Sequence, residues 1–405
     1  MEIAGLESGS PPSWLTPEAT GALGNAARPP FGADEYATRL AGVRRRMAAQ
    51  GVDGVLVFRP SSVEYLCGFH TAERLPQPLL VTESDVVLYV PDFEVGRALV
   101  SCRAPQVRYF RYASAHRALA LVTGHVARLL SDRARVAVEL THPATPPSTV
   151  ELLRQDGLTV LDGDYLVERE RLILSPAELR YVEQAAALTA RGIDAAVDAA
   201  SKPGATDSAI AGASYAALVS EANSESAWGP TVATGPRAGV PHSTFHDVTL
   251  GPDTTFVELS GAHHRYHAPV MRTLCHDTPT SLVRRLAELS QRMLAAVLDN
   301  AKPGVPCAEV ARTAASEVGT LPDDVVFHWL FGYPVGLAHP PHWMDGPPFA
   351  ITADNPEPLA EGMVFHIPGS FRAFGQTGVG LSHTFVVEAH GTRVLTHGTA
   401  ELIEV

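Results

Sequence analysis

The side chains best suited to acid–base chemistry in this 405-residue chain are the histidines of its second half. They are dense between residues 242 and 383, in a set that includes His242, His246, His263, His264, His267, His339, His342, His366 and His383. An unperturbed imidazole has a pKa of about 6.5, so each ring can exchange a proton near neutrality or bind a transition metal. The pattern indicates proton-transfer catalysis or a histidine-rich metal site.

A single acidic residue, Glu258, stands in the stretch VELSG, which is typical of a buried strand. A buried carboxylate needs a cationic partner or a proton. Glu258 could bind a cationic amidine, guanidine or ammonium group, protonate a leaving nitrogen, or be a structural carboxylate paired with Arg272. The sequence leaves all three roles open.

The first half of the chain alternates between helical and extended patterns, which indicates an α/β domain. Apolar residues recur at helical spacing over residues 34–50, and a strand follows at 52–58. The stretch YLCGF reads as strand-like. The run PLLVTESDVVLYV has a turn between two apolar segments and predicts a hairpin. Further strands are predicted near 110 and over 135–140, and helices over 115–130 and 147–155.

The second half begins with a strong helix start and contains an internal repeat. Ser175 is followed by Pro176 and Glu178, the pattern of a capping box, and predicts a helix to about residue 200. The turn Lys-Pro-Gly at 202–204 recurs at 302–304, each time between two helical patterns. We therefore expect a pseudo-symmetric domain with a site at its centre. The predicted divisions are a loose arm over 1–33, an α/β domain over 34–168 and a catalytic domain over 169–405.

Composition excludes several classes of partner. The formal net charge is −13, which disfavours non-specific binding to nucleic acid or to an anionic membrane. No apolar run is long enough to span a membrane. The four cysteines show neither paired nor zinc-site spacing, so we expect reduced thiols in a cytoplasmic protein.

Several segments, in order and spacing, resemble the creatinase/aminopeptidase P superfamily, which has the pita-bread fold. They are EYATRLAGVRRRMAAQGVDGVLVFRPSSVEYLCGF, VATGPRAGVPHSTFHD, FVELSGAHHRYHAPVMRTL, LAEGMVFHIPG and GVGLSHTFVVEAHGTRVLT. The resemblance covers nearly the whole chain. It implies a small creatinase-like N-terminal α/β domain followed by a pseudo-symmetric α+β catalytic domain.

The metallopeptidases of that superfamily hold two metal ions with two Asp, one His and two Glu, and most of these positions differ here. In chain order the matching residues are Glu258, Pro269, Tyr333, the pair Ile367-Pro368, and His383. At most Glu258 and His383 could bind a metal in place, and two ligands of mixed type do not build a dinuclear site. The loss resembles the metal-free branch that contains creatinase and ectoine hydrolase, and GYPVGLAHPPHW with LSHTF favours the ectoine hydrolase side. We therefore expect no metal and no other cofactor.

The resemblance also implies roles for individual residues. His242 falls on the family's active-site histidine and would be the base that activates water, with Glu258 as acid or cation binder. His366 and His383 would face the pocket on two late strands and share proton transfer or bind substrate; the alternative for each is a packing role. Tyr333 would donate its hydroxyl to negative charge developing on an oxygen, or be an ordinary half-buried tyrosine.

Two further groups of residues are candidates for substrate binding. His339, His342 and Asp345 belong to a Pro-bounded loop, HPPHWMDG, of the kind that shapes specificity. His70 and Arg74 belong to the N-terminal domain, which in this superfamily reaches over the partner's active site in a homodimer. Arg74 would then hold a substrate carboxylate across the dimer.

A different metal site is a rival prediction. His263 and His267 are four residues apart, a spacing that suits zinc on a helix. On the hairpin implied by the resemblance, the same spacing places both rings on one face but about 13 Å apart.

The sequence thus predicts a cytoplasmic, homodimeric, metal-independent hydrolase that cleaves a C–N bond of a small polar, amino-acid-like metabolite. The alternatives are a divergent metal-dependent hydrolase with a His-rich site, a lyase or cyclase, and a non-catalytic binding protein on the same fold.

Overall fold

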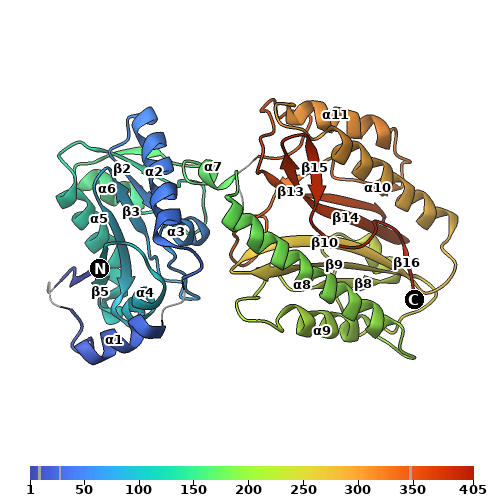
Figure 1. The fold of residues 1–405 in the computed structure, drawn as a ribbon, viewed down its shortest axis with the longest axis horizontal. Coiled ribbons are helices and arrows are strands. Elements are labelled where there is room, and N and C mark those ends of the chain that lie inside the picture. The colour runs from blue at the N-terminus through green and yellow to red at the C-terminus, as the bar shows by residue number, and fades with distance from the viewer. Residues whose placement is uncertain (8–10, 27–28, 346–348) are drawn as a thin grey trace. The chain divides into compact units, whose positions relative to one another are not determined.

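The computed structural model describes residues 1–7, 11–26, 29–345 and 349–405. Within them the chain divides into two compact units, residues 1–171 and 172–405 (Figure 1). Each unit has its own sheets and its own apolar core.

The N-terminal unit is built on one seven-stranded sheet in the order β1-β5-β4-β3-β2-β6-β7. The pairs β2–β3 and β3–β4 are antiparallel, and the other neighbours are parallel. The strands are β1 (Glu2–Gly5), β2 (Gly54–Val57), β3 (Leu79–Thr82), β4 (Val86–Pro91), β5 (Gln106–Phe110), β6 (Arg135–Val138) and β7 (Thr159–Asp162). The hairpin predicted for the run PLLVTESDVVLYV is confirmed as β3–β4.

In the described part of this unit, the α-helices that accompany the sheet are α1 (Pro17–Ala26), α2 (Ala33–Gln50), α3 (Pro60–Cys67), α4 (Val95–Ser101), α5 (Ala118–Leu129), α6 (Thr149–Gln155) and α7 (Glu168–Arg171). The helix expected over 34–50 is confirmed as α2, which ends at Gly51 in the left-handed conformation, φ 63°. The helices expected near 115–130 and 147–155 are confirmed as α5 and α6.

Two segments differ from the sequence prediction. The strand-like YLCGF belongs largely to α3, which begins with Pro60 at its first turn and is buried on every side except at Pro60. Such a helix carries no amphipathic period, so its apolar run reads like a strand. Within the expected loose arm, residues 2–5 form β1, which pairs with the edge of β5, and residues 17–26 form α1.

The C-terminal unit begins at the predicted capping box. The Ser175 hydroxyl accepts a hydrogen bond from the Glu178 backbone N–H (3.2 Å), and the Glu178 carboxylate accepts one from the Ser175 N–H (2.8 Å). The helix α8 (Pro176–Ala200) follows, then α9 (Asp207–Leu218), β8 (Thr231–Thr234), β9 (Thr254–His263) and β10 (Tyr266–Cys275). Strands β8, β9 and β10 are antiparallel neighbours, and the C-terminal β16 (Ile403–Glu404) adds in parallel to β10.

The same order of elements then recurs. Helices α10 (Ser281–Asn300) and α11 (Cys307–Val318) precede β11 (Val325–Val326), β12 (Tyr333–Pro334), β13 (Val364–Ala373), β14 (Thr377–Glu388) and β15 (Gly391–Val394). Gly204 and Gly304 occupy equivalent turns and both have positive φ, 71° and 84°. Figure 1 shows α8 and α9 on one side of the strands and α10 and α11 on the other. The predicted internal repeat is therefore a structural one, and the predicted fold class is confirmed.

The two halves are joined where β10 meets β14. The Met271 N–H donates to the Ser382 hydroxyl (2.6 Å), the Thr384 hydroxyl donates to the Pro269 carbonyl (2.8 Å), and the Gly380 N–H donates to the Thr273 hydroxyl (2.9 Å). Each of these hydrogen bonds joins a side-chain hydroxyl to a backbone group, so β10 and β14 are linked without a continuous ladder of backbone–backbone hydrogen bonds. They hold the inner faces of both hairpins against one another and so position the residues described below.

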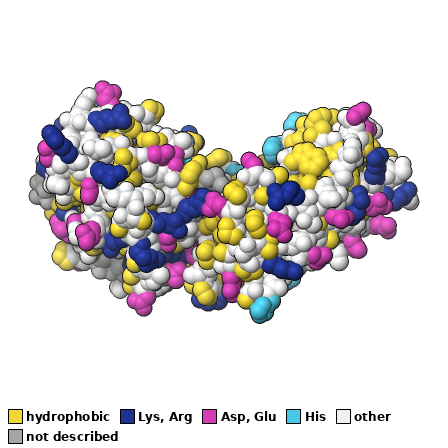
Figure 2. Space-filling model, turned by 90° about the horizontal axis from the view of Figure 1, so that it is seen from above, with side chains coloured by type: hydrophobic (Ala, Val, Ile, Leu, Met, Phe, Trp, Pro, Cys, Tyr) yellow, Lys and Arg dark blue, Asp and Glu magenta, His cyan; other side chains and the backbone are white. Residues whose placement is uncertain are grey.

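The surface carries charged side chains of both signs. On the face shown in Figure 2, Lys and Arg side chains are interspersed with Asp and Glu side chains. None of the described helices combines the length and the apolar character needed to cross a bilayer.

Candidate active site

A cavity of about 230 Å³ lies in the C-terminal unit where its two halves meet. Its walls come from β9, β10 and β13, from the segment 326–333, and from loops near residues 242 and 342. The lining residues are Pro241, His242, Glu258, Met271, Val326, Phe327, His328, Leu330, Tyr333, His342, Met344, Pro368, Ser370 and Arg372. Four predicted site residues are thus brought together: His242, Glu258, Tyr333 and His342.

Glu258 is the acidic group of this cavity. It lies on β9 opposite Met271 of β10 and is only 5% exposed. Burial raises the pKa of its carboxyl to about 7, and the positive charge of Arg372 opposes part of that rise. Among the described residues, none donates a hydrogen bond to this carboxylate. Glu258 therefore combines a near-neutral pKa with oxygens that remain available to a ligand.

The cation beside Glu258 is Arg372, not Arg272 as one sequence interpretation had it. Arg272 follows Met271, so the strand alternation places it on the other side of β10 from Glu258. Its guanidinium donates to the carbonyls of Met271 (2.9 Å), Ser382 (2.8 Å) and His397 (3.1 Å). Arg272 thus links strands through hydrogen bonds from its guanidinium to backbone carbonyl groups.

Arg372 was not identified from the sequence because it lies about 110 residues from Glu258 and no motif marks it. Its Nε donates to the Ser370 hydroxyl (3.0 Å) and its Nη1 to the Ala238 carbonyl. The guanidinium carbon lies 4.1 Å from the centre of the Phe256 ring. Its Nη2 makes no hydrogen bond to any described residue. The guanidinium of Arg372 is therefore fixed in the cavity wall by its Nε and Nη1 contacts, and its Nη2 is free to bind an anion.

His242 lies on the exposed side of the cavity, in the loop after β8. Its backbone has φ 58°, a left-handed conformation that a residue other than glycine adopts at some strain. Its ring centre lies 5.9 Å from that of Trp228, whose indole also contacts His342 (4.4 Å) and Trp343 (5.1 Å). The loop thus holds an imidazole at the mouth of the cavity that contains Glu258.

Tyr333 and His366 belong to a buried hydrogen-bonded chain. The Trp343 indole N–H donates to the Tyr333 hydroxyl (2.9 Å), which is 2.6 Å from His366 Nδ1. His366 Nε2 is 2.7 Å from the Ser382 hydroxyl. Burial, then the charges of His383 and Arg272, lower the pKa of His366 well below its usual value. His366 is therefore a neutral imidazole behind Tyr333, and it is not among the cavity-lining residues.

His383 also lies outside the lining of the cavity. Its Nδ1 is 3.0 Å from the Thr396 hydroxyl, and burial together with Arg272 lowers its pKa to about 4. The residue is mostly buried, with 8% of its surface exposed. The structure thus places His383 beside β15 and its following loop, where it is neutral near pH 7.

The Pro-bounded loop contributes one of its three predicted residues to the cavity. His342 Nδ1 accepts the Met344 N–H (2.9 Å), and burial followed by the charge of His242 lowers the His342 pKa to about 4. The proton of this neutral ring is therefore on Nε2. His339 and Asp345 are not among the residues that line the cavity.

His70 and Arg74 line a different cavity, of about 360 Å³, in the N-terminal unit. His70 Nδ1 lies 3.5 Å from the Glu64 carboxylate. Arg74 is exposed. Their expected role at a partner's active site stays a prediction.

The residues at the family's metal-ligand positions do not fit a dinuclear centre. Pro269 has no donor side chain, and its carbonyl is bonded to Thr384. The pKa of Tyr333 is raised well above its usual value by burial and by Glu258, so its hydroxyl is neutral. Among the described residues, no group of three or more His, Cys, Asp or Glu side chains is arranged to hold a metal ion.

The rival pair His263 and His267 does not supply such a site either. His267 is fully buried, and its Nε2 accepts the Ala227 N–H (2.9 Å) while its Nδ1 faces the Gly336 carbonyl. Both ring nitrogens are thus committed to backbone.

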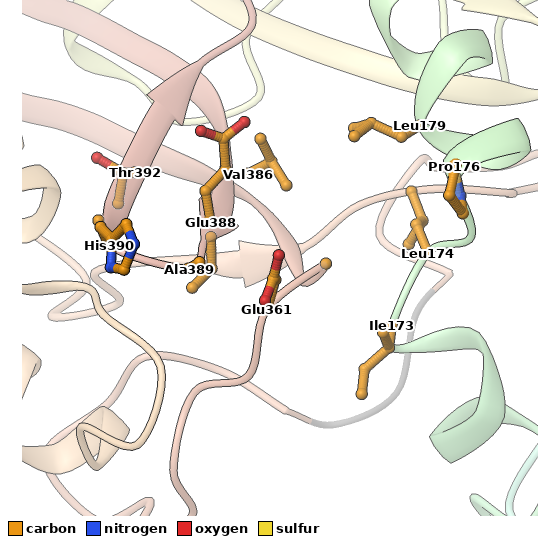
Figure 3. Close-up of a pocket in the computed structure, with 13 residues that line it drawn as sticks. Ile173, Leu174, Pro176, Leu179, Glu361, Val386, Glu388, Ala389, His390 and Thr392 are labelled. Carbon is orange, nitrogen blue, oxygen red and sulfur yellow. The ribbon is translucent and has the colours of Figure 1, made fainter.

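A second hollow of the C-terminal unit contains none of the predicted site residues. It is an open groove of about 710 Å³ between the start of α8 and the β14–β15 turn. Figure 3 shows Glu361, Glu388 and His390 on one side of it and Ile173, Leu174 and Leu179 on the other. Its polar groups are few and widely spread, so the smaller cavity around Glu258 is the candidate active site.

Comparisons with known proteins agree with this fold. A model of metallopeptidase family M24 matches residues 180–389, and one of the creatinase/prolidase N-terminal domain matches residues 39–173. The chain is 29% identical to an uncharacterised hydrolase/peptidase of Sinorhizobium fredii, over 92% of this chain and 98% of that relative. It is 27% identical to the ectoine hydrolase of Halomonas elongata, over 84% and 90%.

Solved structures give the same picture. The crystal structure of a dipeptidase from Mycobacterium ulcerans superposes with a TM-score of 0.77 at 23% identity, covering 93% of this chain and 99% of the other. A prolidase from Thermococcus sibiricus superposes with a TM-score of 0.79 at 18% identity, covering 92% and 100%. These likenesses confirm the fold that the sequence motifs predicted. The chain belongs to metallopeptidase family M24, with a creatinase/prolidase N-terminal domain before the catalytic one.

Proposed function

We propose that the protein is a metal-independent hydrolase that cleaves a C–N bond of a small polar metabolite in the cavity around Glu258. One observation carries the proposal. A carboxyl group with a pKa of about 7 and no hydrogen-bond donor among the described residues shares that cavity with an imidazole and a guanidinium. Groups with near-neutral pKa values are those that acid–base catalysis requires.

The mechanism assigns the two proton-transfer steps to two residues. His242 takes a proton from water, and the resulting hydroxide attacks the carbon of the C–N bond. Glu258, about half protonated near pH 7, gives its proton to the departing nitrogen. The hydroxyl from water is then on carbon and the Glu258 proton is on nitrogen. The proton that His242 took from water returns to Glu258 through solvent, so both groups regain their starting states and atoms and charge balance. Tyr333 donates its hydroxyl to the oxygen on which negative charge develops.

The cavity also suggests the class of substrate. Its volume of about 230 Å³ suits a metabolite rather than a peptide. The free Nη2 of Arg372 would bind a carboxylate with a charge-assisted hydrogen bond. Met271, Leu330 and Phe327 would pack against the carbon skeleton. Small amides, amidines and guanidino compounds that carry a carboxylate fit these features, and the ectoine hydrolase relative supports this choice.

Further parts of the proposal concern the protein's assembly. We propose that it acts as a homodimer in the cytoplasm, with His70 and Arg74 of one subunit placed at the site of the other. An interface variant that separates the subunits, with Arg74 unchanged, should raise KM if this arrangement operates. An unchanged KM in a monomer would limit His70 and Arg74 to their own N-terminal cavity.

The decisive test is a substrate screen run with and without chelator. Cyclic amidines, N-acyl diamino acids and guanidino acids are incubated with protein whose metal content has been measured. We expect turnover of at least one class, equal in EDTA and in buffer. Turnover that EDTA abolishes and Mn²⁺ or Zn²⁺ restores would contradict the metal-independent mechanism. Binding without turnover, unchanged by His242→Ala, would favour a binding protein.

A further inference from the structure

We propose that Ser382 and His366 are positioning residues that hold the hydroxyl proton of Tyr333 toward the cavity, so that Tyr333 serves only as a hydrogen-bond donor to a ligand oxygen. The contacts are short and form one continuous chain of hydrogen bonds. They run from the Met271 N–H to Ser382 (2.6 Å), to His366 Nε2 (2.7 Å), and from His366 Nδ1 to Tyr333 (2.6 Å).

The direction of each proton follows from what each group can donate and accept. The Ser382 hydroxyl accepts the Met271 N–H, and its only other contact among the described residues is His366 Nε2. Ser382 is fully buried. Its own proton therefore has one acceptor within reach, which is Nε2. A buried hydroxyl without an acceptor would be destabilising.

That assignment determines the rest of the chain. If Nε2 accepts from Ser382, a neutral His366 carries its proton on Nδ1 and donates it to the Tyr333 oxygen. The same oxygen also accepts the Trp343 indole N–H (2.9 Å). With both acceptor positions filled, the Tyr333 hydroxyl can act only as a donor. Tyr333 lines the cavity that contains Glu258, so its proton is offered there.

The reverse arrangement leaves a buried group unsatisfied. If Tyr333 donated to Nδ1, the His366 proton would be on Nε2 and would be given to Ser382. The Ser382 hydroxyl would then accept two hydrogen bonds and have no acceptor for its own proton. The imidazolium form fails in the same way, and burial together with Arg272 and His383 disfavours that charge. The forward direction satisfies every fully buried member of the chain.

Two donors on Tyr333 also affect its strength. Hydrogen bonds from His366 and Trp343 pull electron density from the phenol oxygen, which makes its O–H a better donor to an oxyanion. The ligand is thus expected to place a carbonyl or carboxylate oxygen, not an N–H, against Tyr333. This expectation about the ligand rests on the proposed function, whereas the proton direction does not.

The first experiment measures the proton position without any ligand. Protein labelled with ¹⁵N-histidine is studied by long-range ¹H–¹⁵N NMR, and the His366 signals are assigned by their loss in His366→Asn. We expect the Nδ1–H tautomer, unchanged from pH 6 to pH 8 while exposed histidines titrate. The Nε2–H tautomer, or titration of His366 in that range, would overturn the inference.

The second experiment separates donation from packing. His366→Asn keeps an N–H donor near the place of Nδ1, whereas His366→Leu has nearly the same shape and no donor. For a substrate found in the screen, we expect kcat to stay close to wild type in the Asn variant and to fall about tenfold in the Leu variant, because the Tyr333 donor acts on charge that develops during the reaction. Equal kinetics in the two variants would contradict the donor role.

Matched controls guard against loss of folding. Ser290→Ala removes another buried serine hydroxyl, one that donates to the Gly369 carbonyl (2.8 Å). Both Ser290→Ala and Ser382→Ala should lower the unfolding temperature, but only Ser382→Ala, which removes the donor to Nε2, should change the His366 tautomer. If no substrate is found, the NMR result alone decides the proton direction, so its failure and that of the proposed function are distinguished.

Discussion

The two halves of the catalytic unit share one architecture but differ in the charge they present to the cavity. The β9–β10 half contributes Glu258, a buried carboxyl whose oxygens receive no hydrogen bond from the described residues. The β13–β14 half contributes Arg372 and, behind Tyr333, the neutral pair His366 and Ser382. One half therefore supplies an available acid, and the other supplies donors that are held in place.

This contrast explains how one fold can support different chemistry. In a dinuclear centre both halves must supply anionic oxygen to the same point, because paired dications need several carboxylates. Here the second half presents hydroxyl, imidazole and guanidinium groups at the equivalent strands. A single carboxylate among such groups is suited to moving one proton, and the substitutions below are designed to test that asymmetry.

The largest effect is expected for Glu258→Gln. The amide keeps the size of the side chain but cannot give up a proton, so kcat should fall about 10²- to 10⁴-fold. Steady-state kinetics on a substrate from the screen measures the change. Glu178→Gln is the matched control, because Glu178 is equally buried but belongs to the helix cap. A normal kcat in the Glu258→Gln enzyme would show that Glu258 is not the catalytic acid of the β9–β10 half.

The pH dependence of stability provides a second test of Glu258. Burial raises its pKa from 4.5 to about 7, so the folded state binds a proton that the unfolded state releases between these values. Ionising the buried group therefore destabilises the fold as pH rises through this window, by about 3 kcal/mol once the pH is above 7. Below pH 4.5 the effect is absent.

Urea unfolding of wild type and Glu258→Gln at pH 5 and pH 8 measures this linkage. The variant should gain stability relative to wild type at pH 8 and little at pH 5. A stability difference that does not change between the two pH values would mean that the Glu258 carboxyl is not shifted by burial.

A smaller effect is expected for Arg372→Met in the second half. Losing the guanidinium removes the partner of a substrate carboxylate, so KM should rise about 10- to 100-fold. It also removes the charge that opposes the raised pKa of Glu258, so the alkaline limb of the kcat profile should move to higher pH. Arg372→Lys, which keeps the charge, should leave that limb near its wild-type position. Movement of the limb to lower pH would contradict the assignment.

Much of the fold could be read from the sequence because its signals are local or periodic. The Ser175–Glu178 cap, the 34–50 helix and the repeated Lys-Pro-Gly turns each predicted an element that the structure contains. The helix α3 was read as strand-like because a helix buried on nearly all sides leaves no period in its sequence.

The site was predicted only in part, because contacts between distant strands leave little trace in a sequence. His242, Glu258, Tyr333 and His342 do line one cavity. His366 and His383 lie on the predicted strands but are not among the lining residues. His383 pairs with Ile367 and so lies on the opposite face from Pro368, Ser370 and Arg372, whereas His366 shares the face of these three residues but stands behind Tyr333. Arg372 has no neighbouring motif, so its position beside Glu258 depends on the packing of one half against the other.

The smallest expected effect tests whether the halves are equivalent outside the site. Gly204 and Gly304 both have positive φ, and a Cβ at either would meet nothing within 4 Å. Alanine at each position should therefore destabilise the protein only through backbone strain, by about 1 kcal/mol. Paired thermal unfolding of Gly204→Ala and Gly304→Ala measures this, with kcat as the second readout. Similar stability losses and unchanged kcat are expected, because the asymmetry belongs to the side chains of the cavity. A selective loss of kcat in one variant would show that the turn itself helps to position that half.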